Sequence, residues 1–229
     1  MMKTMPTNIF VKNIRKSYSK KAVLRDVNIS FEEGKCIGII GENGCGKTTL
    51  LSILSGLVPY ESGEFIYGDT DLLKNDAKRQ EIVGYIPQGE PLVEELSAMD
   101  NLLMWYEKDA IEKSLKYGVL GMLGIGMFID IPVKKMSGGM KKRLSIGCGV
   151  HHNPKLLILD EPTAALDMSC REKIYSYLKD YRNSGNTIIM VTHEVREIEL
   201  CDEIYILKNG EAFKYTYDGN VTHLVGQLK

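Results

Sequence analysis

The sequence predicts an α/β fold built as a single domain, with a mostly helical stretch inserted into it. Strand-like and helix-like segments alternate along much of the chain, which is typical of the α/β class. From about residue 94 to residue 152 the pattern is mostly helical, and strand-like segments return only at Leu156. A chain of 229 residues is long enough for one large domain with a subdomain. We therefore expect one domain over 1–229, in which a helical subdomain, about 94–152, interrupts an α/β core formed by 1–93 and 153–229.

The segments before the helical stretch predict two kinds of strand. Val27, Ile29 and Phe31 alternate with polar residues, as in a strand that is exposed on one face. The run from Cys36 to Ile40 is apolar throughout, as expected for a parallel strand that is buried on both faces. A glycine-rich loop follows this run, and the next apolar residues recur at helical spacing: Leu50, Leu51, Ile53, Leu54 and Leu57.

The alternation continues along the rest of the chain. Four further runs are predicted as strands: 82–86, 156–159, 187–191 and 204–207. Two stretches between the later runs have helical patterns: 169–182 and 194–200.

Composition narrows the possible function classes. Hydrophobic residues make up 44% of the chain and charged residues 26%, which are ordinary values for a globular protein. The 29 Lys and Arg residues nearly balance the 30 Asp and Glu residues, so the formal net charge is -1. This balance argues against a nucleic-acid binder that depends on a basic surface field.

The cysteines and the apolar segments indicate the compartment. Five cysteines without a C-x-x-C pair argue against a disulfide framework or a structural zinc site, and they favour a reducing cytoplasm. The segment Met1–Phe10 lacks the apolar stretch of a secretory signal. The longest uncharged run, 117–129, is shorter than the roughly 18 apolar residues of a membrane span. We expect a cytoplasmic chain that does not cross a bilayer by itself.

Eight consecutive residues fit the phosphate-loop pattern G-x-x-x-x-G-K-[ST]: Gly41, Glu42, Asn43, Gly44, Cys45, Gly46, Lys47 and Thr48. The loop lies between a predicted buried strand and a predicted helix, which is the context that this pattern requires. An ordinary glycine-rich turn is the alternative, but a chance match in such a chain arises only about once in a hundred. We expect these residues and the adjacent Thr49 to bind nucleotide.

The residue types of this loop suit phosphate chemistry. Glycines let the backbone curl so that successive N–H groups point at one phosphate cluster, and the helix N-terminus adds a partial positive charge. Lys47 can reach the β- and γ-phosphates, and the Thr48 hydroxyl can ligate Mg²⁺. The helix N-terminus and Lys47 are also expected to lower the pKa of the Cys45 thiol and to make it reactive toward maleimides.

Two carboxylates follow the buried strand at 156–159. Asp160 and Glu161 lie at the carboxyl end of this strand, where ligands bind in open α/β sheets. We expect Asp160 to hold Mg²⁺ and Glu161 to polarise the water that attacks the γ-phosphate. Taken alone, the pair is equally typical of an exposed acidic turn before Pro162, but the phosphate loop favours the catalytic interpretation.

His193 and Gln88 follow two other predicted strands. His193 comes after 187–191, at the same expected sheet edge, and is predicted to contact the γ-phosphate, although a lone histidine is more often structural. Gln88 follows 82–86 and is expected to reach Mg²⁺ or the attacking water, although a loop glutamine is usually just solvated. The predicted catalytic residues are thus Glu161, His193, Gln88 and Lys47.

Taken together, the motifs resemble the ATP-binding cassette of an ABC transporter over nearly the whole chain. They occur in that family's order: the Walker A loop at 41–48, the Q-loop at Gln88, the signature at 136–140, Walker B at 156–161, the D-loop at 165–167 and the H-loop at His193. The resemblance implies a P-loop NTPase core with a mixed sheet and an inserted helical subdomain. It also implies ATPase activity with ATP and Mg²⁺, and the stacking of Tyr18 on the adenine.

The signature departs from the family pattern LSGGQ at two positions, where Met136 replaces Leu and Met140 replaces Gln. Its centre, Ser137, Gly138 and Gly139, is intact and opens a predicted helix, which is an anion-binding arrangement. In the family, two cassettes pair head to tail, and each ATP lies between one chain's Walker A loop and the other chain's signature. The resemblance therefore implies a second ABC ATPase chain, identical or different, as a partner.

Three functions are compatible with these motifs. The leading one is the ATPase subunit that powers a separate membrane permease and lies peripherally on the inner face of the cell membrane. The short stretch after 204–207 weakly favours an export-type permease. The alternative is a soluble ABC-type ATPase in cofactor assembly or another non-transport complex. A nucleic-acid-linked cassette is disfavoured, because such proteins usually carry two cassettes or long coiled coils, and we expect no nucleic-acid partner.

Three sets of side chains are expected to have ordinary structural roles. One set is predicted on the solvent side of a helix: Lys141, Lys142 and Arg143. Another is predicted to pack adaptably in the core: Met122, Met127 and Met136. The last is predicted in the core of the helical subdomain: Trp105 and Tyr106.

Overall fold

The structure is a computed structural model that describes residues 7–228. Residues 1–6 and Lys229 lie outside the described part, and the expectations for the first residues of the domain and for most of Met1–Phe10 lie there with them. The strands are β1 (Asn8–Tyr18), β2 (Lys21–Glu32), β3 (Cys36–Ile40), β4 (Ser62–Tyr67), β5 (Thr70–Asp71), β6 (Val83–Ile86), β7 (Leu156–Asp160), β8 (Thr187–Val191), β9 (Glu203–Lys208) and β10 (Glu211–Tyr215). The α-helices are α1 (Lys47–Leu54), α2 (Asp76–Ile82), α3 (Ala98–Leu103), α4 (Lys108–Tyr117), α5 (Val119–Met122), α6 (Gly138–Gly149), α7 (Met168–Asn183), α8 (Val195–Leu200) and α9 (Val221–Leu228). Two short 3-10 helices are η1 (Ile125–Phe128) and η2 (Val133–Lys135).

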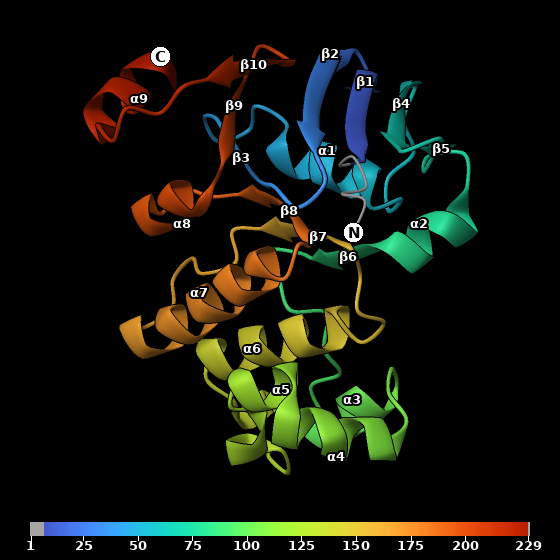
Figure 1. The fold of residues 1–229 in the computed structure, drawn as a ribbon, viewed down its shortest axis with the longest axis vertical. Helices are drawn as coiled ribbons and strands as arrows, with labels where there is room; N and C mark the ends of the chain where they lie inside the picture. Colours follow the sequence, from blue (N-terminus) through green and yellow to red (C-terminus); the bar gives the residue numbers. More distant parts are fainter. Residues whose placement is uncertain (1–6, 229) are drawn as a thin grey trace, which may run out of the picture.

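Within residues 7–228 the strands form one mixed sheet in the order β5-β4-β1-β2-β10-β9-β3-β8-β7-β6. The strands β9, β3, β8, β7 and β6 are parallel to one another, whereas β1 pairs antiparallel with β2 and β4. The two parts join at a single residue pair, Glu211 of β10 and Asp26 of β2, and Figure 1 shows the antiparallel strands standing away from the parallel ones. The predicted α/β fold with a mixed sheet is confirmed.

The buried parallel strands occupy the predicted positions. β3, β7 and β8 are buried at every residue, as their apolar runs predict. β6 begins at Val83, because Ile82 closes α2 instead of opening the strand. α1 ends at Leu54, so Leu57 lies beyond the helix and is 66% exposed, which corrects the predicted helical stretch.

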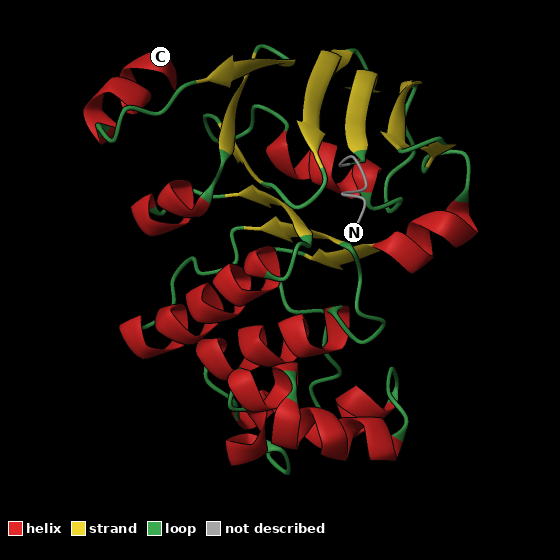
Figure 2. Cartoon of the chain, in the orientation of Figure 1, coloured by secondary structure: helices red, strands yellow, loops and turns green. Residues whose placement is uncertain are grey.

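Two large cores lie on opposite faces of the parallel strands. On one face, Ile158 of β7 packs in a cluster with Leu50 and Leu51 of α1 and with residues of β1 and β2. On the other face, Leu157 and Leu159 of β7 pack in a cluster with residues of α6 and α7. Figure 2 shows this division, with the strands and α1 in one half of the molecule and the helices α3 to α7 in the other. The fold therefore separates a sheet-bearing half, which carries the phosphate loop, from a helical half.

Three side chains predicted in the core are exposed instead. Met122, Met127 and Trp105 are 45%, 82% and 55% exposed. Their segments bury other apolar side chains: Leu102, Leu120, Leu123, Ile125 and Phe128. Met136 is buried and Tyr106 half-buried as predicted. No helix within residues 7–228 is long and apolar enough to span a bilayer.

Candidate active site

Four parallel strands end at one edge of the sheet, and each leads into predicted site residues. β3 leads into the phosphate loop, β6 into Gln88, β7 into Asp160 and Glu161, and β8 into His193. Because the carboxyl ends of neighbouring parallel strands lie at the same edge, the fold brings these residues together.

The phosphate loop curls tightly between β3 and α1. Gly46 has a φ of 109°, and a Cβ on Gly41 would lie 2.4 Å from the carbonyl oxygen of Leu207, so both positions require glycine. Lys47 is 6% exposed, and its ammonium donates hydrogen bonds to the carbonyls of Gly41 (2.7 Å) and Glu42 (3.0 Å). The lysine charge therefore lies against the loop backbone, at the start of the helix.

The predicted lowering of the pKa of Cys45 is wrong. Burial raises the pKa of this thiol, and this effect outweighs the opposing effects of the Lys47 charge and of the backbone N–H groups of Lys47 and Cys45. The Cys45 sulfur folds back over the loop, because it lies 2.7 Å from the point where a Cβ on Gly41 would stand. The sequence indicates the charge and the helix terminus, but it does not indicate the burial that dominates.

Asp160 is 1% exposed at the end of β7. Burial raises the pKa of this carboxyl, while a hydrogen bond from the Thr48 hydroxyl lowers it. Its Oδ2 atom has no hydrogen-bond partner among the described residues. Mg²⁺ is bound by oxygen ligands, carboxylates among them. A hydroxyl next to a buried, unpartnered carboxylate oxygen therefore fits the expected metal site.

Glu161 lies between Gln88 and His193. The side-chain amide of Gln88 donates a hydrogen bond to Glu161 Oε2 (3.1 Å), and His193 Nε2 lies 3.8 Å from Glu161 Oε1. The backbone of Glu161 is left-handed, with a φ of 48°, and its N–H donates to the carbonyl of Val191 (2.9 Å). This bond ties the loop after β7 to the end of β8. The structure thus gathers three of the predicted catalytic residues in one cluster.

The remaining predicted binding residues come from other elements. Tyr18 ends β1 and is 47% exposed, and the ammonium of Lys16 lies 5.0 Å from its ring centre. Ser137 caps α6, because its hydroxyl accepts a hydrogen bond from the N–H of Met140 (3.3 Å). The helix opens with the two signature glycines, Gly138 and Gly139. Figure 1 shows α6 in the helical half of the molecule and α1 among the strands.

The basic run on α6 is not the solvated surface that the sequence predicts. Lys142 is 2% exposed. Arg143 is half-buried, with its guanidinium carbon 4.9 Å from the ring centre of Phe128. Lys141 pairs with Glu94 at 3.0 Å. The groups that these three side chains contact belong to Pro87, Gln88, Glu94 and Phe128. These residues are distant from α6 in sequence, so the local run of basic residues does not predict the contacts.

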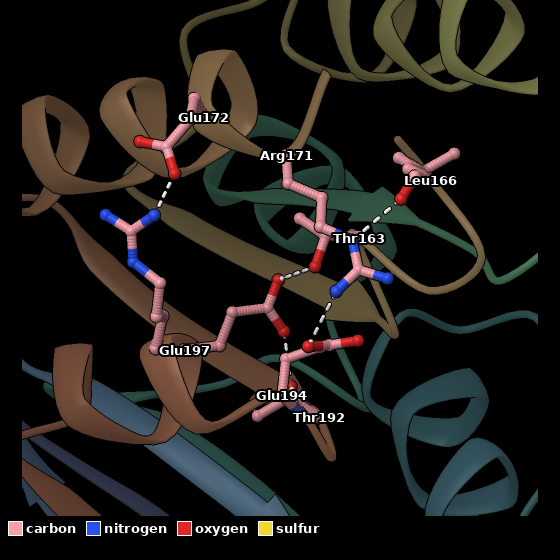
Figure 3. A network of polar contacts seen from close by, with 8 residues as sticks. Thr163, Leu166, Arg171, Glu172, Thr192, Glu194 and Glu197 are labelled. Atoms are coloured by element: carbon pink, nitrogen blue, oxygen red, sulfur yellow. Dashed lines mark hydrogen bonds and ion pairs between the residues drawn. The ribbon is translucent and has the colours of Figure 1, made fainter. Parts of the chain in front are cut away.

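Glu197 is a buried carboxylate near the site that was not predicted from the sequence. Glu197 of α8 is 2% exposed, and it accepts hydrogen bonds from the hydroxyls of Thr163 (2.7 Å) and Thr192, as Figure 3 shows. Thr163 lies two residues after Glu161, and Thr192 directly precedes His193. Glu197 therefore joins the two loops that carry these predicted catalytic residues.

Arg171 of α7 extends the contacts between the same loops. It donates to the carbonyl of Leu166 (2.8 Å), in the predicted D-loop, and pairs with Glu194 (2.8 Å), as Figure 3 also shows. Glu194 and Glu197 are three residues apart, a spacing that places two side chains on one face of a helix. That spacing beside His193 is the signal in the sequence that points to this network.

Comparisons with known proteins identify the family to which this chain belongs. The family described as ABC transporter matches residues 24–164. The linearmycin resistance ATP-binding protein LnrL of Bacillus subtilis is 36% identical over 204 residues, which are 87% of this chain and 66% of that protein. The lantibiotic transport ATP-binding protein SrtF of Streptococcus pyogenes is 35% identical over 92% of this chain and 91% of that protein. The spermidine/putrescine import ATP-binding protein PotA of Spiroplasma citri is 35% identical over 90% of this chain and 61% of that protein.

Solved structures share the whole architecture. A nucleotide-free ATP-binding cassette from an ABC transporter matches with a TM-score of 0.83 at 22% identity, over 96% of this chain and 95% of that chain. A dimeric cassette in a post-hydrolysis state, bound to ADP and phosphate, matches with a TM-score of 0.79 at 28% identity, over 91% of this chain and 98% of that chain. The family match covers more than half of the chain, and the fold of its relatives agrees with it. The chain therefore belongs to the ATP-binding proteins of the ABC transporter family, which are ATPases.

Proposed function

We propose that this chain binds ATP and hydrolyses it to power a separate membrane permease. The cluster of Gln88, Glu161 and His193 beside the phosphate loop is the observation that carries this proposal. One relative is named for linearmycin resistance and another for lantibiotic transport, and on these names we favour an export-type permease over the import type named for PotA. The alternative is a soluble ABC-type ATPase that acts in cofactor assembly or another non-transport complex.

In this proposal the phosphate loop and Tyr18 hold ATP. The backbone N–H groups of residues 41–49 surround the phosphates, and the buried ammonium of Lys47 binds the β- and γ-phosphates. The exposed ring of Tyr18 stacks on the adenine. Thr48 and Asp160 would hold Mg²⁺, with Gln88 as a further oxygen ligand. When bound, Mg²⁺ neutralises charge on the β- and γ-phosphates.

Glu161 is the proposed base for the attacking water. The amide of Gln88 donates to Oε2 of this carboxylate, and Oε1, which faces His193 Nε2 at 3.8 Å, is the oxygen proposed to accept a proton from water. His193, on the far side of Glu161, contacts the γ-phosphate and stabilises the charge that develops there.

The proposed active form contains two cassettes. Residues 1–229 act as one domain with a helical subdomain at 94–152, and Ser137, Gly138 and Gly139 bind the γ-phosphate of an ATP held by a second chain, identical or different. The dimeric solved cassette supports this arrangement. The pair would work peripherally on the cytoplasmic face of the membrane, against the permease.

Replacing Glu161 with Gln tests the proposed hydrolysis. Glu161→Gln keeps the shape of the side chain but does not accept a proton, so kcat is expected to fall by about 10²–10⁴-fold while ATP binding is retained. Glu199→Gln, an exposed carboxylate on α8, is the matched control and is expected to keep the parent rate. A Glu161→Gln chain that hydrolyses ATP at the parent rate would refute the assigned base.

The permease is tested by purification of the tagged chain from detergent-solubilised membranes. A polytopic membrane protein is expected to co-purify in fixed proportion and to be identified by mass spectrometry. Recovery of the chain from the soluble fraction alone, with no membrane protein bound, would favour the non-transport alternative.

A further inference from the structure

Lys142 is a buried cation whose partners are backbone carbonyls. It lies in α6 and is 2% exposed, and its ammonium donates hydrogen bonds to the carbonyls of Pro87 (2.7 Å) and Gln88 (3.0 Å). A buried charge is expensive unless it is paired and hydrogen-bonded. The Lys142 ammonium meets this requirement through the carbonyls of two consecutive residues in the loop after β6.

Four carboxylates lie close enough to Lys142 to act on its charge. Burial lowers the pKa of the amine, but four carboxylates act against that effect: Glu90, Asp160, Glu161 and Glu197. Two of them, Asp160 and Glu161, belong to the proposed active site. Lys142 thus donates hydrogen bonds to the Gln88 loop and lies near two carboxylates of the proposed site, Asp160 and Glu161.

The loop that Lys142 holds presents Gln88 to Glu161. The Gln88 backbone carbonyl accepts from Lys142, while the Gln88 side-chain amide donates to Glu161 at 3.1 Å. One residue therefore connects the ammonium to the proposed base. A shift of this loop would move the amide away from the carboxylate.

The N-terminus of α6 carries the signature. Ser137 caps the helix, and Lys142 lies five residues further along it, about 7.5 Å along the helix axis at 1.5 Å per residue. Figure 1 shows α6 between the β6–β7 edge of the sheet and the helices α3 to α5. A helix is a stiff element, so a displacement of its N-terminus is transmitted to Lys142 and to the loop that it holds.

We propose that Lys142 is a positioning residue that couples the signature helix to the Gln88–Glu161 pair of the same chain. Engagement of Ser137 by the ATP of a second cassette is then felt at this chain's own hydrolysis site. The inference rests on the proposed function, because it takes Gln88 and Glu161 as parts of the hydrolysis machinery. It adds a physical link between the two ATP sites of a pair.

The test compares Lys142→Met with Lys141→Met. Methionine keeps much of the length of the lysine side chain but donates no hydrogen bond, so the Gln88 loop is released. The expected result is a fall in kcat of about ten- to a hundredfold, as for a small misplacement of catalytic groups. KM and the affinity for ATP are expected to stay unchanged, because Lys47 and Tyr18 are untouched. Lys141→Met, on the same helix, loses only its pair with the exposed Glu94 and is expected to keep the parent kcat.

Two further variants separate positioning from simple stability. Lys142→Arg can still donate to both carbonyls and is expected to restore most of kcat. Where Lys142→Met does not fold, Lys142→Gln, which keeps one amide donor, is measured in its place, with melting temperature recorded for each variant. Parent kcat in Lys142→Met, or in Lys142→Gln when that variant replaces it, would overturn the inference.

A double-mutant cycle with Gln88→Ala decides whether the effect passes through Gln88. On that background Lys142→Met is expected to lower kcat by less than about twofold, because coupled residues are not additive. A full additional loss would overturn the coupling while leaving the proposed function intact. Parent activity in both Gln88→Ala and Glu161→Gln would instead refute the proposed function itself.

Discussion

Burial sets the behaviour of individual charged and polar side chains in this cassette. Lys47, Lys142 and Glu197 are each less than a tenth exposed, and each has hydrogen-bond partners within the chain. Buried polar groups must be satisfied in this way, because an unpaired one costs about 1–3 kcal/mol.

Lys47→Ala is expected to weaken ATP binding while the fold survives. The substitution removes a charge-assisted contact to the β- and γ-phosphates, worth about 1.5–3 kcal/mol, which corresponds to an affinity lower by about ten- to a hundredfold. Calorimetric titration with ATP measures the change, and circular dichroism checks the fold. A variant that binds ATP as tightly as the parent would exclude Lys47 from phosphate binding.

Cys45 is expected to react slowly at neutral pH, which reverses the expectation from the sequence. Its pKa lies above the ordinary value of 9.0, because burial outweighs the effect of Lys47, so little thiolate exists near pH 7. The rate of maleimide labelling at Cys45, followed by mass spectrometry, should rise steeply as the pH is raised from about 7 to about 9. Mg-ATP should slow this labelling. A rate at pH 7 above that of an unstructured cysteine peptide would contradict the raised pKa.

Glu197→Gln is expected to change how stability depends on pH. Burial raises the pKa of Glu197 above its ordinary value of 4.5, although hydrogen bonds from Thr192 and Thr163 lower it; the charge of Glu194 raises it further and that of Arg171 lowers it. An acid whose pKa is higher in the folded state contributes stability at low pH and loses it as the pH rises through the folded pKa. Gln does not titrate, so the variant should gain stability relative to the parent from about pH 5 to about pH 8. Urea denaturation at about pH 5 and about pH 8 measures the free energy of unfolding of the parent and of Glu197→Gln. A difference between the two proteins that is the same at both pH values would refute this prediction.

At the scale of elements, the strands and the glycine-rich loop were predictable because their signals are local. β3 and β8 match their apolar runs at both ends, since a strand buried on both faces needs an unbroken apolar sequence. The polar residues after the runs at 156–159 and 187–191 were enough to predict that Glu161 and His193 share one sheet edge, and the structure places Gln88, after β6, beside them.

Contacts between distant segments were not predictable in the same way. Lys142 looks solvated in sequence because its neighbours Lys141 and Arg143 are also basic, and only the fold brings the carbonyls after β6 to its ammonium. The sequence predicts Met122 and Met127 in the core, but other apolar side chains of the same segments are buried there instead. Cys45 packs against the core formed by β1, β2 and α1, and its position in a motif does not reveal this burial.

The N-terminus of α7 is stabilised by a capping side chain. Asp167, in the D-loop, caps the helix by accepting a hydrogen bond from the N–H of Cys170 (2.9 Å). Asp167→Ala should lower the free energy of unfolding by about 0.5–2 kcal/mol, whereas Asp167→Asn should retain most of it, because asparagine caps nearly as well. Urea denaturation of the two variants measures the difference. Equal losses in both would show that the carboxylate charge, not the cap, is what matters.

At the scale of the whole molecule, the two halves carry different parts of the proposed machinery. The sheet-bearing half holds the phosphate loop and Glu161, and the helical half presents Ser137 at the start of α6. In the proposed pair, each ATP lies between Lys47 of one chain and Ser137 of the other. An ATP that is bound but not hydrolysed should hold two chains together, because a ligand that binds the pair and not the single chain shifts the equilibrium by mass action.

The most direct measurement of this claim is light scattering coupled to size exclusion on the Glu161→Gln chain. We expect a monomer without nucleotide and a dimer with ATP. Ser137→Arg on the same background is expected to abolish the dimer, because bulk and charge then occupy the shared phosphate site. A Glu161→Gln chain that binds ATP by calorimetry and yet stays monomeric at high concentration would contradict pairing between identical chains.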